Sequence, residues 1–191
     1  MEKKLDGEYN GHAYVDMGFS VKWATCNVGA GSPEEYGDYY AWGETEPKSN
    51  YTKGNCKTMR ECIGDIGGTS MDVAHVKWGG SWRMPTREEF EELNDDSNCT
   101  WEWTTRNGVN GYQVTSKKTG NHIFFPAAGL YIEAPSDVGY FAHYRSSTPE
   151  PGEYLYVYEL QFWGGGRHSS YYRGVNCERR WGGKSVRPVT E

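Results

Sequence analysis

Short stretches of alternating apolar and polar residues dominate this chain and predict β-strands rather than long helices. Residues 12–28 contain two such stretches around a turn at Met17 and Gly18. The side chains expected to point inward from this pair are Val15, Phe19, Val21 and Trp23. Turn residues separate three further strands, which are expected at residues 99–105, 111–116 and 122–129.

Two more strands are expected near the end of the sequence. The inward side of residues 154–162 is predicted to consist of Tyr154, Tyr156, Tyr158, Leu160 and Phe162. Ser185–Val189 predicts a last strand that pairs with the N-terminal strands and lies near a sheet edge, because Pro188 has no N–H to donate. Between them, Gly164–Asn176 has a period of neither two nor 3.6 residues and predicts an exposed loop.

Helical periodicity is confined to the middle of the chain. A first helix is expected over residues 70–78, ending at Gly79, with an inward face of Val73, Val76 and Trp78. A second is expected over residues 87–94, where Thr86 and Glu89 form a capping box. Its core-facing residues are expected to be Phe90 and Leu93. Residues 46–68 are polar and aperiodic, which predicts a surface insertion.

Composition agrees with a single domain of short strands and turns over residues 1–191. The chain has 25 glycines, which favour turns, and 15% aromatic residues, which must form much of the core. Its formal net charge of -6 excludes nucleic acid as the main partner, because such binding needs a basic surface.

The sequence contains no apolar run long enough to cross a bilayer, so no direct membrane insertion is expected. The first seven residues lack the apolar stretch of a signal peptide, which indicates that an export signal was removed or never present. Five cysteines without a CxxC pair predict neither a zinc ribbon nor a complete disulfide framework. Cys56 and Cys62 could close a small loop or could remain separate thiols.

Several spaced motifs carry a resemblance that covers nearly the whole chain, from Val15 to Val189. In order, they are VDMGFSVKWATCNVGA, PEEYGDYYAWGETEPK, WGGSWRMPTREEFEEL, NGVNGYQVTS, IFFPAAG and GGKSVRPV. They resemble surface-associated proteins of gut Bacteroidetes and their phages, which are related to the formylglycine-generating-enzyme (sulfatase-modifying-factor) branch of the C-type lectin fold. The resemblance implies an α+β C-type-lectin-like fold, with two helices packed on a small antiparallel sheet, long loops and paired termini.

Some proteins of this group are the variable proteins of diversity-generating retroelements, in which a mutagenic reverse transcriptase rewrites adenines near the end of the gene. The resemblance therefore implies a non-catalytic module at the cell surface or on a phage virion, with a variable ligand-binding region over residues 140–185. Its expected partner is a protein or glycan receptor on another cell. The candidate ligand-binding residues are Tyr140, Phe141, His143, Tyr144, Arg145, Trp163, His168, Ser169, Ser170, Tyr171, Tyr172, Arg173 and Asn176. A fixed-specificity adhesin or structural domain of a surface lipoprotein is the main alternative.

Catalytic and metal sites are not expected. The oxidase chemistry of the sulfatase-modifying family needs two neighbouring cysteines near the end of the domain, and only Cys177 lies there. The motifs by which C-type lectins bind calcium are missing, and the histidines lack metal-binding spacing. We therefore expect no catalytic residue, cofactor or metal, and the oxidase ranks third among the functions considered.

Overall fold

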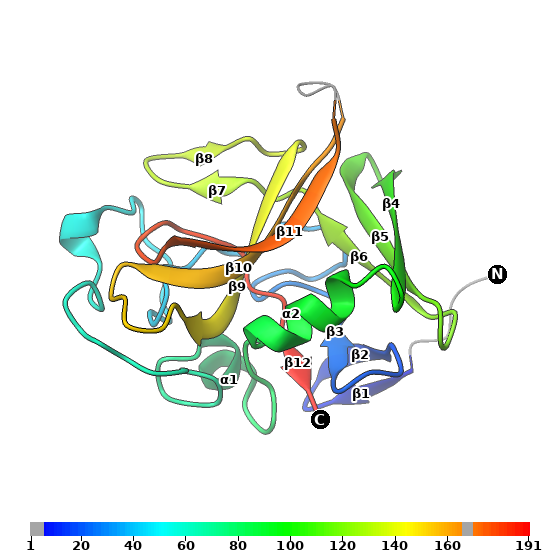
Figure 1. Cartoon of the computed structure of the whole chain (residues 1–191), viewed down its shortest axis with the longest axis horizontal. Coiled ribbons are helices and arrows are strands. Elements are labelled where there is room, and N and C mark those ends of the chain that lie inside the picture. Colours follow the sequence, from blue (N-terminus) through cyan, green and yellow to red (C-terminus); the bar gives the residue numbers. More distant parts are fainter. Residues whose placement is uncertain (1–5, 166–169) are drawn as a thin grey trace.

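The computed structural model describes residues 6–165 and 170–191. Within these ranges the chain forms four small antiparallel sheets and two short α-helices (Figure 1). Strands account for 38% of the chain and helices for 9%, so the α+β C-type-lectin-like expectation, with two helices packed on one small sheet, is wrong. The physical reason is that glycine-rich, aromatic segments favour short strands and turns over helices.

The first sheet has the strand order β1-β2-β3-β12. Its strands are β1 Gly7–Tyr9, β2 His12–Asp16, β3 Lys22–Ala24 and β12 Val189–Thr190. Val189 lies opposite Trp23 in the antiparallel ladder, which confirms the expected pairing of the last strand with the N-terminal strands. The strand itself is shorter than expected and begins directly after Pro188.

The other sheets lie in the second half of the chain. Their strands are β4 Cys99–Arg106, β5 Val109–Ser116 and β6 His122–Pro126; β7 Leu130–Tyr131 and β8 Pro135–Ser136; and β9 Phe141–Pro149, β10 Tyr156–Trp163 and β11 Tyr172–Arg179. The expected hairpins between β4, β5 and β6 are confirmed. The expected loop is wrong in its last part, because β11 pairs with β10 along the whole length of both strands.

The inward face of β10 also differs from the expectation. The ladder between β9 and β10 is irregular between Val157 and Glu159, which shifts the alternation of buried positions. As a result Val157, Leu160 and Phe162 are buried, whereas Tyr154 is 51% exposed. The tyrosines before this irregularity therefore do not fill the core.

Helix α1 spans Val73–Trp78 and is shorter than expected. The carboxylate of Asp72 caps it by accepting hydrogen bonds from two backbone N–H groups, and Gly79 ends it with a φ of 69°. Val76 is 49% exposed, so its expected inward position is wrong. One short 3-10 helix, η1, spans Lys53–Asn55.

Helix α2 spans Arg87–Asn94, as predicted. The Thr86 hydroxyl accepts a hydrogen bond from the backbone of Glu89, and the Glu89 carboxylate accepts one from the backbone of Thr86. Phe90 and Leu93 are fully buried in the main core. This core also joins β3, β5, β6, β9 and β10, so α2 supports the core-facing side of the sheet formed by β9, β10 and β11.

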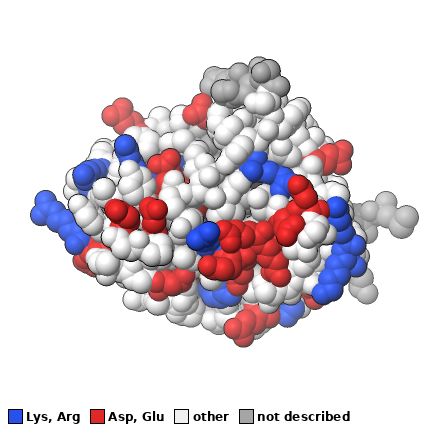
Figure 2. Space-filling view, in the orientation of Figure 1, with Lys and Arg blue, Asp and Glu red and all other residues white. Residues whose placement is uncertain are grey.

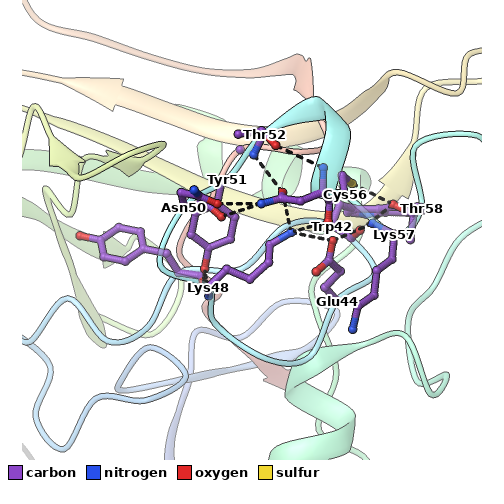
Figure 3. A network of polar contacts seen from close by, with 12 residues as sticks. Trp42, Glu44, Lys48, Asn50, Tyr51, Thr52, Cys56, Lys57 and Thr58 are labelled. Carbon is purple, nitrogen blue, oxygen red and sulfur yellow. Dashed lines mark hydrogen bonds and ion pairs between the residues drawn. The ribbon is translucent and has the colours of Figure 1, made fainter.

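Residues 46–68 are tied to the rest of the molecule by a polar network (Figure 3). Lys48 Nζ donates to the Glu44 carboxylate over 3.0 Å, and the Thr58 hydroxyl donates to the Trp42 carbonyl over 2.9 Å. The segment also buries apolar side chains, namely Tyr51, Cys56, Met59 and Ile66. It therefore folds over the molecule with polar anchors and apolar side chains that pack against residues from the rest of the chain.

Candidate functional site

The sheet of β9, β10 and β11 has one face toward the main core and one away from it. Side chains alternate along each strand, so cross-strand neighbours at every second position share a face. Leu160 and Phe162 point into the main core. We call the opposite side the outer face; its residues are Phe141, His143, Arg145, Glu159, Gln161, Trp163, Tyr172, Gly174 and Asn176.

An aromatic rung crosses one end of the outer face. Trp163 of β10 lies opposite Phe141 of β9 on one side and Tyr172 of β11 on the other. The Trp163 and Tyr172 rings are stacked, with centroids 4.1 Å apart and an interplanar angle of 20°, and the Phe141 ring lies 5.4 Å from that of Trp163. All three residues are half-buried, so the rung combines fixed ring positions with accessible apolar surface.

Polar groups adjoin the aromatic rung along β11. Asn176 Nδ2 donates to the Tyr172 hydroxyl over 2.7 Å and to Gln161 Oε1 over 3.3 Å. Gly174 lies beneath the Tyr172 ring, and a Cβ atom there would lie 2.5 Å from the Tyr172 hydroxyl oxygen. The missing side chain at Gly174 therefore allows Tyr172 to lie along the strand and reach Asn176.

A buried carboxylate occupies the middle of the outer face. Glu159 is fully buried, and its oxygens accept hydrogen bonds from Arg145 Nη1 over 2.9 Å, Gln161 Nε2 over 2.8 Å and His143 Nδ1 over 2.6 Å. Burial alone would raise the pKa of Glu159, but the charges of Lys184 and Arg145 and the hydrogen bond from His143 together hold that pKa well below its usual range. The carboxylate is therefore ionised and fixes the polar side chains around it.

Arg145 links this carboxylate to the segment that follows β11. Its Nη2 donates to the carbonyl of Arg179 over 2.6 Å and to that of Gly182 over 3.0 Å. The guanidinium is fully buried, and this burial lowers the pKa of Arg145. The contacts hold the segment at residues 180–184 next to the outer face.

A pocket of about 160 Å³ lies between this segment, β7 and the outer face. Its lining residues are Leu130, Ile132, His143, Glu178, Arg179, Trp181, Gly182 and Lys184. The Lys184 side chain is only 4% exposed, and burial lowers its pKa, although the Glu159 charge acts in the opposite direction. His143 belongs to both the pocket and the outer face, so the two form one continuous site.

The structure brings together part of the predicted set of binding residues. Those on the outer face with accessible side chains are Phe141, His143, Trp163, Tyr172 and Asn176. Tyr140 is half-buried directly before β9, and Ser170 and Tyr171 are exposed directly before β11. The predicted residues His168 and Ser169 lie outside the described residues.

Three predicted binding residues do not lie on the accessible surface of the outer face. Tyr144 is fully buried in the main core, where its hydroxyl donates to the Pro126 carbonyl over 2.8 Å. Arg145 is fully buried beside Glu159. Arg173 faces the opposite side of the sheet, where its guanidinium contacts Asn94 at the end of α2. The alternation of β9 and β11, which the residue composition does not reveal, explains the positions of Tyr144 and Arg173. Arg145 lies on the outer face but is covered by the segment at residues 180–184, whose Gly182 carbonyl accepts a hydrogen bond from it.

The sequence reasoning missed three residues of the site: Glu159, Gln161 and Lys184. A signal existed for Glu159, because it is the single acidic residue within an aromatic and aliphatic strand. Such a charge is rarely buried without partners. Lys184 lacked a comparable signal, since its burial depends on the segment at residues 180–184 folding back onto the sheet.

Comparison with known proteins identifies no relative of this chain. No family model, curated protein or solved structure matches the chain. Among the described residues, no group of three or more histidine, cysteine or acidic side chains is placed to hold a metal ion. No helix in the described ranges has the length and apolar character needed to span a membrane.

The cysteines are dispersed over the molecule as free thiols. Cys56 is buried and Cys62 is exposed, and the two remain separate in the structure. Cys177 lies on β11, on the face opposite Asn176, and burial raises the pKa of its thiol. A raised pKa disfavours the thiolate, so the local environment does not activate Cys177 as a nucleophile.

Proposed function

We propose that this chain is a non-catalytic ligand-binding module that presents the outer face to a protein or glycan receptor on another cell surface. One observation carries the proposal: Phe141, Trp163 and Tyr172 form a half-buried aromatic rung on a sheet whose other face is closed by the main core. Aromatic rings offer a wide contact area at a low entropy cost. A rigid sheet further limits the cost of ordering them on binding.

The residue types around this rung support a more specific version of the proposal. Adenine-directed mutagenesis of asparagine-type codons yields a set of residues that includes Tyr, Ser, His, Asp, Gly, Asn and Phe. The positions with these types in or beside the outer face are Tyr140, Phe141, His143, Ser170, Tyr171, Tyr172, Gly174 and Asn176. In this version the chain is a retroelement-diversified protein displayed at the cell surface or on a phage virion. A nearby reverse-transcriptase gene and an adenine-rich near-copy of the region encoding residues 140–185 are the expected genomic signs, and their absence would contradict diversification.

A fixed-specificity adhesin is the second candidate, and the buried carboxylate favours it. Glu159 holds both His143 and Gln161 by hydrogen bonds. Free substitution at these two positions would remove partners from a buried charge, which destabilises a protein. In the adhesin version the same face binds one receptor with an unchanging sequence.

An array of glycans and surface proteins tests the binding function directly. The wild-type chain is expected to bind at least one class of ligand. Trp163→Ala and the double variant Tyr171→Ala/Tyr172→Ala are expected to lose about tenfold or more in affinity, as is typical when a central aromatic side chain is truncated. Tyr154→Ala is the matched control, because Tyr154 is an exposed aromatic residue beyond the opposite end of β10.

Equal losses of affinity in Trp163→Ala, in the double tyrosine variant and in Tyr154→Ala would indicate a non-specific effect and contradict the assigned surface. Absence of binding by the wild type to every arrayed ligand would contradict the function itself. Thermal unfolding of each variant should show the native transition, so that lost affinity is attributed to the surface.

A further inference from the structure

Lys184 is the most unusual polar side chain of the pocket. Its side chain is 4% exposed and lines the pocket, and its Nζ atom forms a long ion pair with the Glu159 carboxylate. The nearest carboxylate oxygen belongs to Glu159 and is 3.8 Å away, beyond hydrogen-bond distance. A buried ammonium that is compensated by only one long ion pair gains from a closer acceptor, and a bound anion in the pocket would supply it.

Glu159 does not fill this role because its oxygens are already engaged. Arg145, His143 and Gln161 all donate to them over 2.6–2.9 Å. These contacts hold the carboxylate in the outer face, so Lys184 keeps its hydrogen-bonding capacity for a ligand. His143 also lines the pocket, with the Nδ1 atom committed to Glu159.

The formal charges around the pocket favour one negative charge. The cations are Lys184, Arg145 and Arg179, and the anions are Glu159 and Glu178, which gives a net charge of three minus two, or +1, with His143 neutral. The whole chain has a net charge of -6, so this local excess runs against the overall balance. Dianions such as phosphate are usually bound by several charged donors, whereas a single ammonium with one excess charge suits a carboxylate.

Acidic residues are concentrated on a different part of the surface. Figure 2 shows them gathered over α2 and the residues that follow it; those in this stretch are Glu88, Glu91, Glu92, Asp95 and Asp96. Helix α2 supports the core-facing side of the sheet, whereas the pocket adjoins the outer face. An anionic ligand is therefore repelled from the α2 side and is accepted at the pocket.

We infer that the pocket binds the carboxylate of an acidic sugar, such as a uronic or sialic acid residue of a receptor glycan, through Lys184. The inference rests on the proposed binding function and specifies its ligand class. A volume of about 160 Å³ accommodates a carboxylate and part of one sugar ring. The neighbouring aromatic rung offers a flat surface to the next ring, and Gln161 and Asn176 supply amide groups for its hydroxyls.

Paired oligosaccharides that differ only in their carboxylate test the inference. Isothermal titration calorimetry would compare glucuronic-acid-terminated with glucose-terminated chains, and sialylated with asialo chains. The wild type is expected to bind an acidic member about tenfold or more tightly than its neutral partner, as one charge-assisted hydrogen bond provides. Lys184→Met should remove this preference, and Lys184→Arg should retain part of it.

Lys118→Met provides the control, because it removes a lysine outside the pocket and should leave the preference unchanged. Equal binding of acidic and neutral glycans would overturn the carboxylate inference and leave the binding function standing. Binding of an acidic peptide without any glycan would also overturn it. The double variant Tyr171→Ala/Tyr172→Ala separates the two proposals, because it should weaken acidic and neutral ligands alike.

Discussion

Glu159 determines how the outer face is organised at the residue scale. One ionised carboxylate positions an arginine, a histidine and a glutamine, and compensates two buried cations. Neutralising one member of a buried charge cluster leaves the others without compensation, which destabilises far more than loss of a surface pair. The binding surface and the stability of the fold therefore depend on the same side chain.

Glu159→Gln is expected to lower the free energy of unfolding by about 3–5 kcal/mol at neutral pH. The folded-state pKa of Glu159 lies below its ordinary value of 4.5. The contribution of the ionised carboxylate to the free energy of unfolding is therefore complete above about pH 5 and is lost as pH falls through and below 4.5. Urea unfolding of the wild type from pH 7 to pH 3 should show this loss, and the variant should show a weaker dependence. Glu153→Gln, at an exposed position, is the control; an equal effect in both variants would contradict the assignment.

At the residue scale, the sequence predicts a side chain's position correctly where the spacing of apolar residues marks the inward face. Trp23, Phe90 and Leu93 were correctly placed in the core because their periodicity identifies the inward face. Tyr144 and Arg173 were misplaced because residue type alone does not reveal which side of a strand a side chain occupies. Tyrosine serves equally well in a core and on a binding surface.

At the element scale, α2 and β11 show what local sequence can and cannot specify. Every determinant of α2 lies within its own residues, in the capping box and in the spacing of Phe90 and Leu93. Strand β11 depends on its partner, since nearly all of its side chains are half-buried and no alternation marks a face. Its register with β10 is a long-range property, which the composition of residues 172–179 does not encode on its own.

Thr86→Ala tests the local origin of α2. Removal of the hydroxyl leaves the backbone N–H of Glu89 without its acceptor, and is expected to lower the free energy of unfolding by about 1 kcal/mol. Chemical denaturation measures the change. Thr100→Ala, which removes an exposed hydroxyl on β4, is the comparison, and a larger loss there would argue against the cap.

At the scale of the whole molecule, the tail of the chain connects several sheets. Arg187 is fully buried, and its guanidinium donates to Asn27 Oδ1 over 2.8 Å and to the carbonyls of Thr25 and Phe124, each over 3.0 Å. It also lies over the Phe125 ring at 4.7 Å. One side chain near β12 therefore fixes the segment after β3 and strand β6 at the same time.

Arg187→Met is expected to lower the free energy of unfolding by at least about 3 kcal/mol, because the substitution leaves several buried acceptors unpaired. Differential scanning calorimetry should show a single transition at lower temperature. Arg60→Met, which removes an exposed guanidinium, should leave the transition nearly unchanged. A tail that melted separately before the main transition would contradict a shared core.

The alternation of half-buried and buried positions at the start of β9, from Phe141 to Tyr144, has an evolutionary consequence. Neighbouring positions have different roles, because one side chain is partly accessible to a ligand while the next packs in the core. Any process that rewrites this stretch of the gene is therefore expected to retain changes at the half-buried positions more readily than at the buried positions between them. Among related sequences, differences in this strand should alternate with unchanged residues at the buried positions Ala142 and Tyr144.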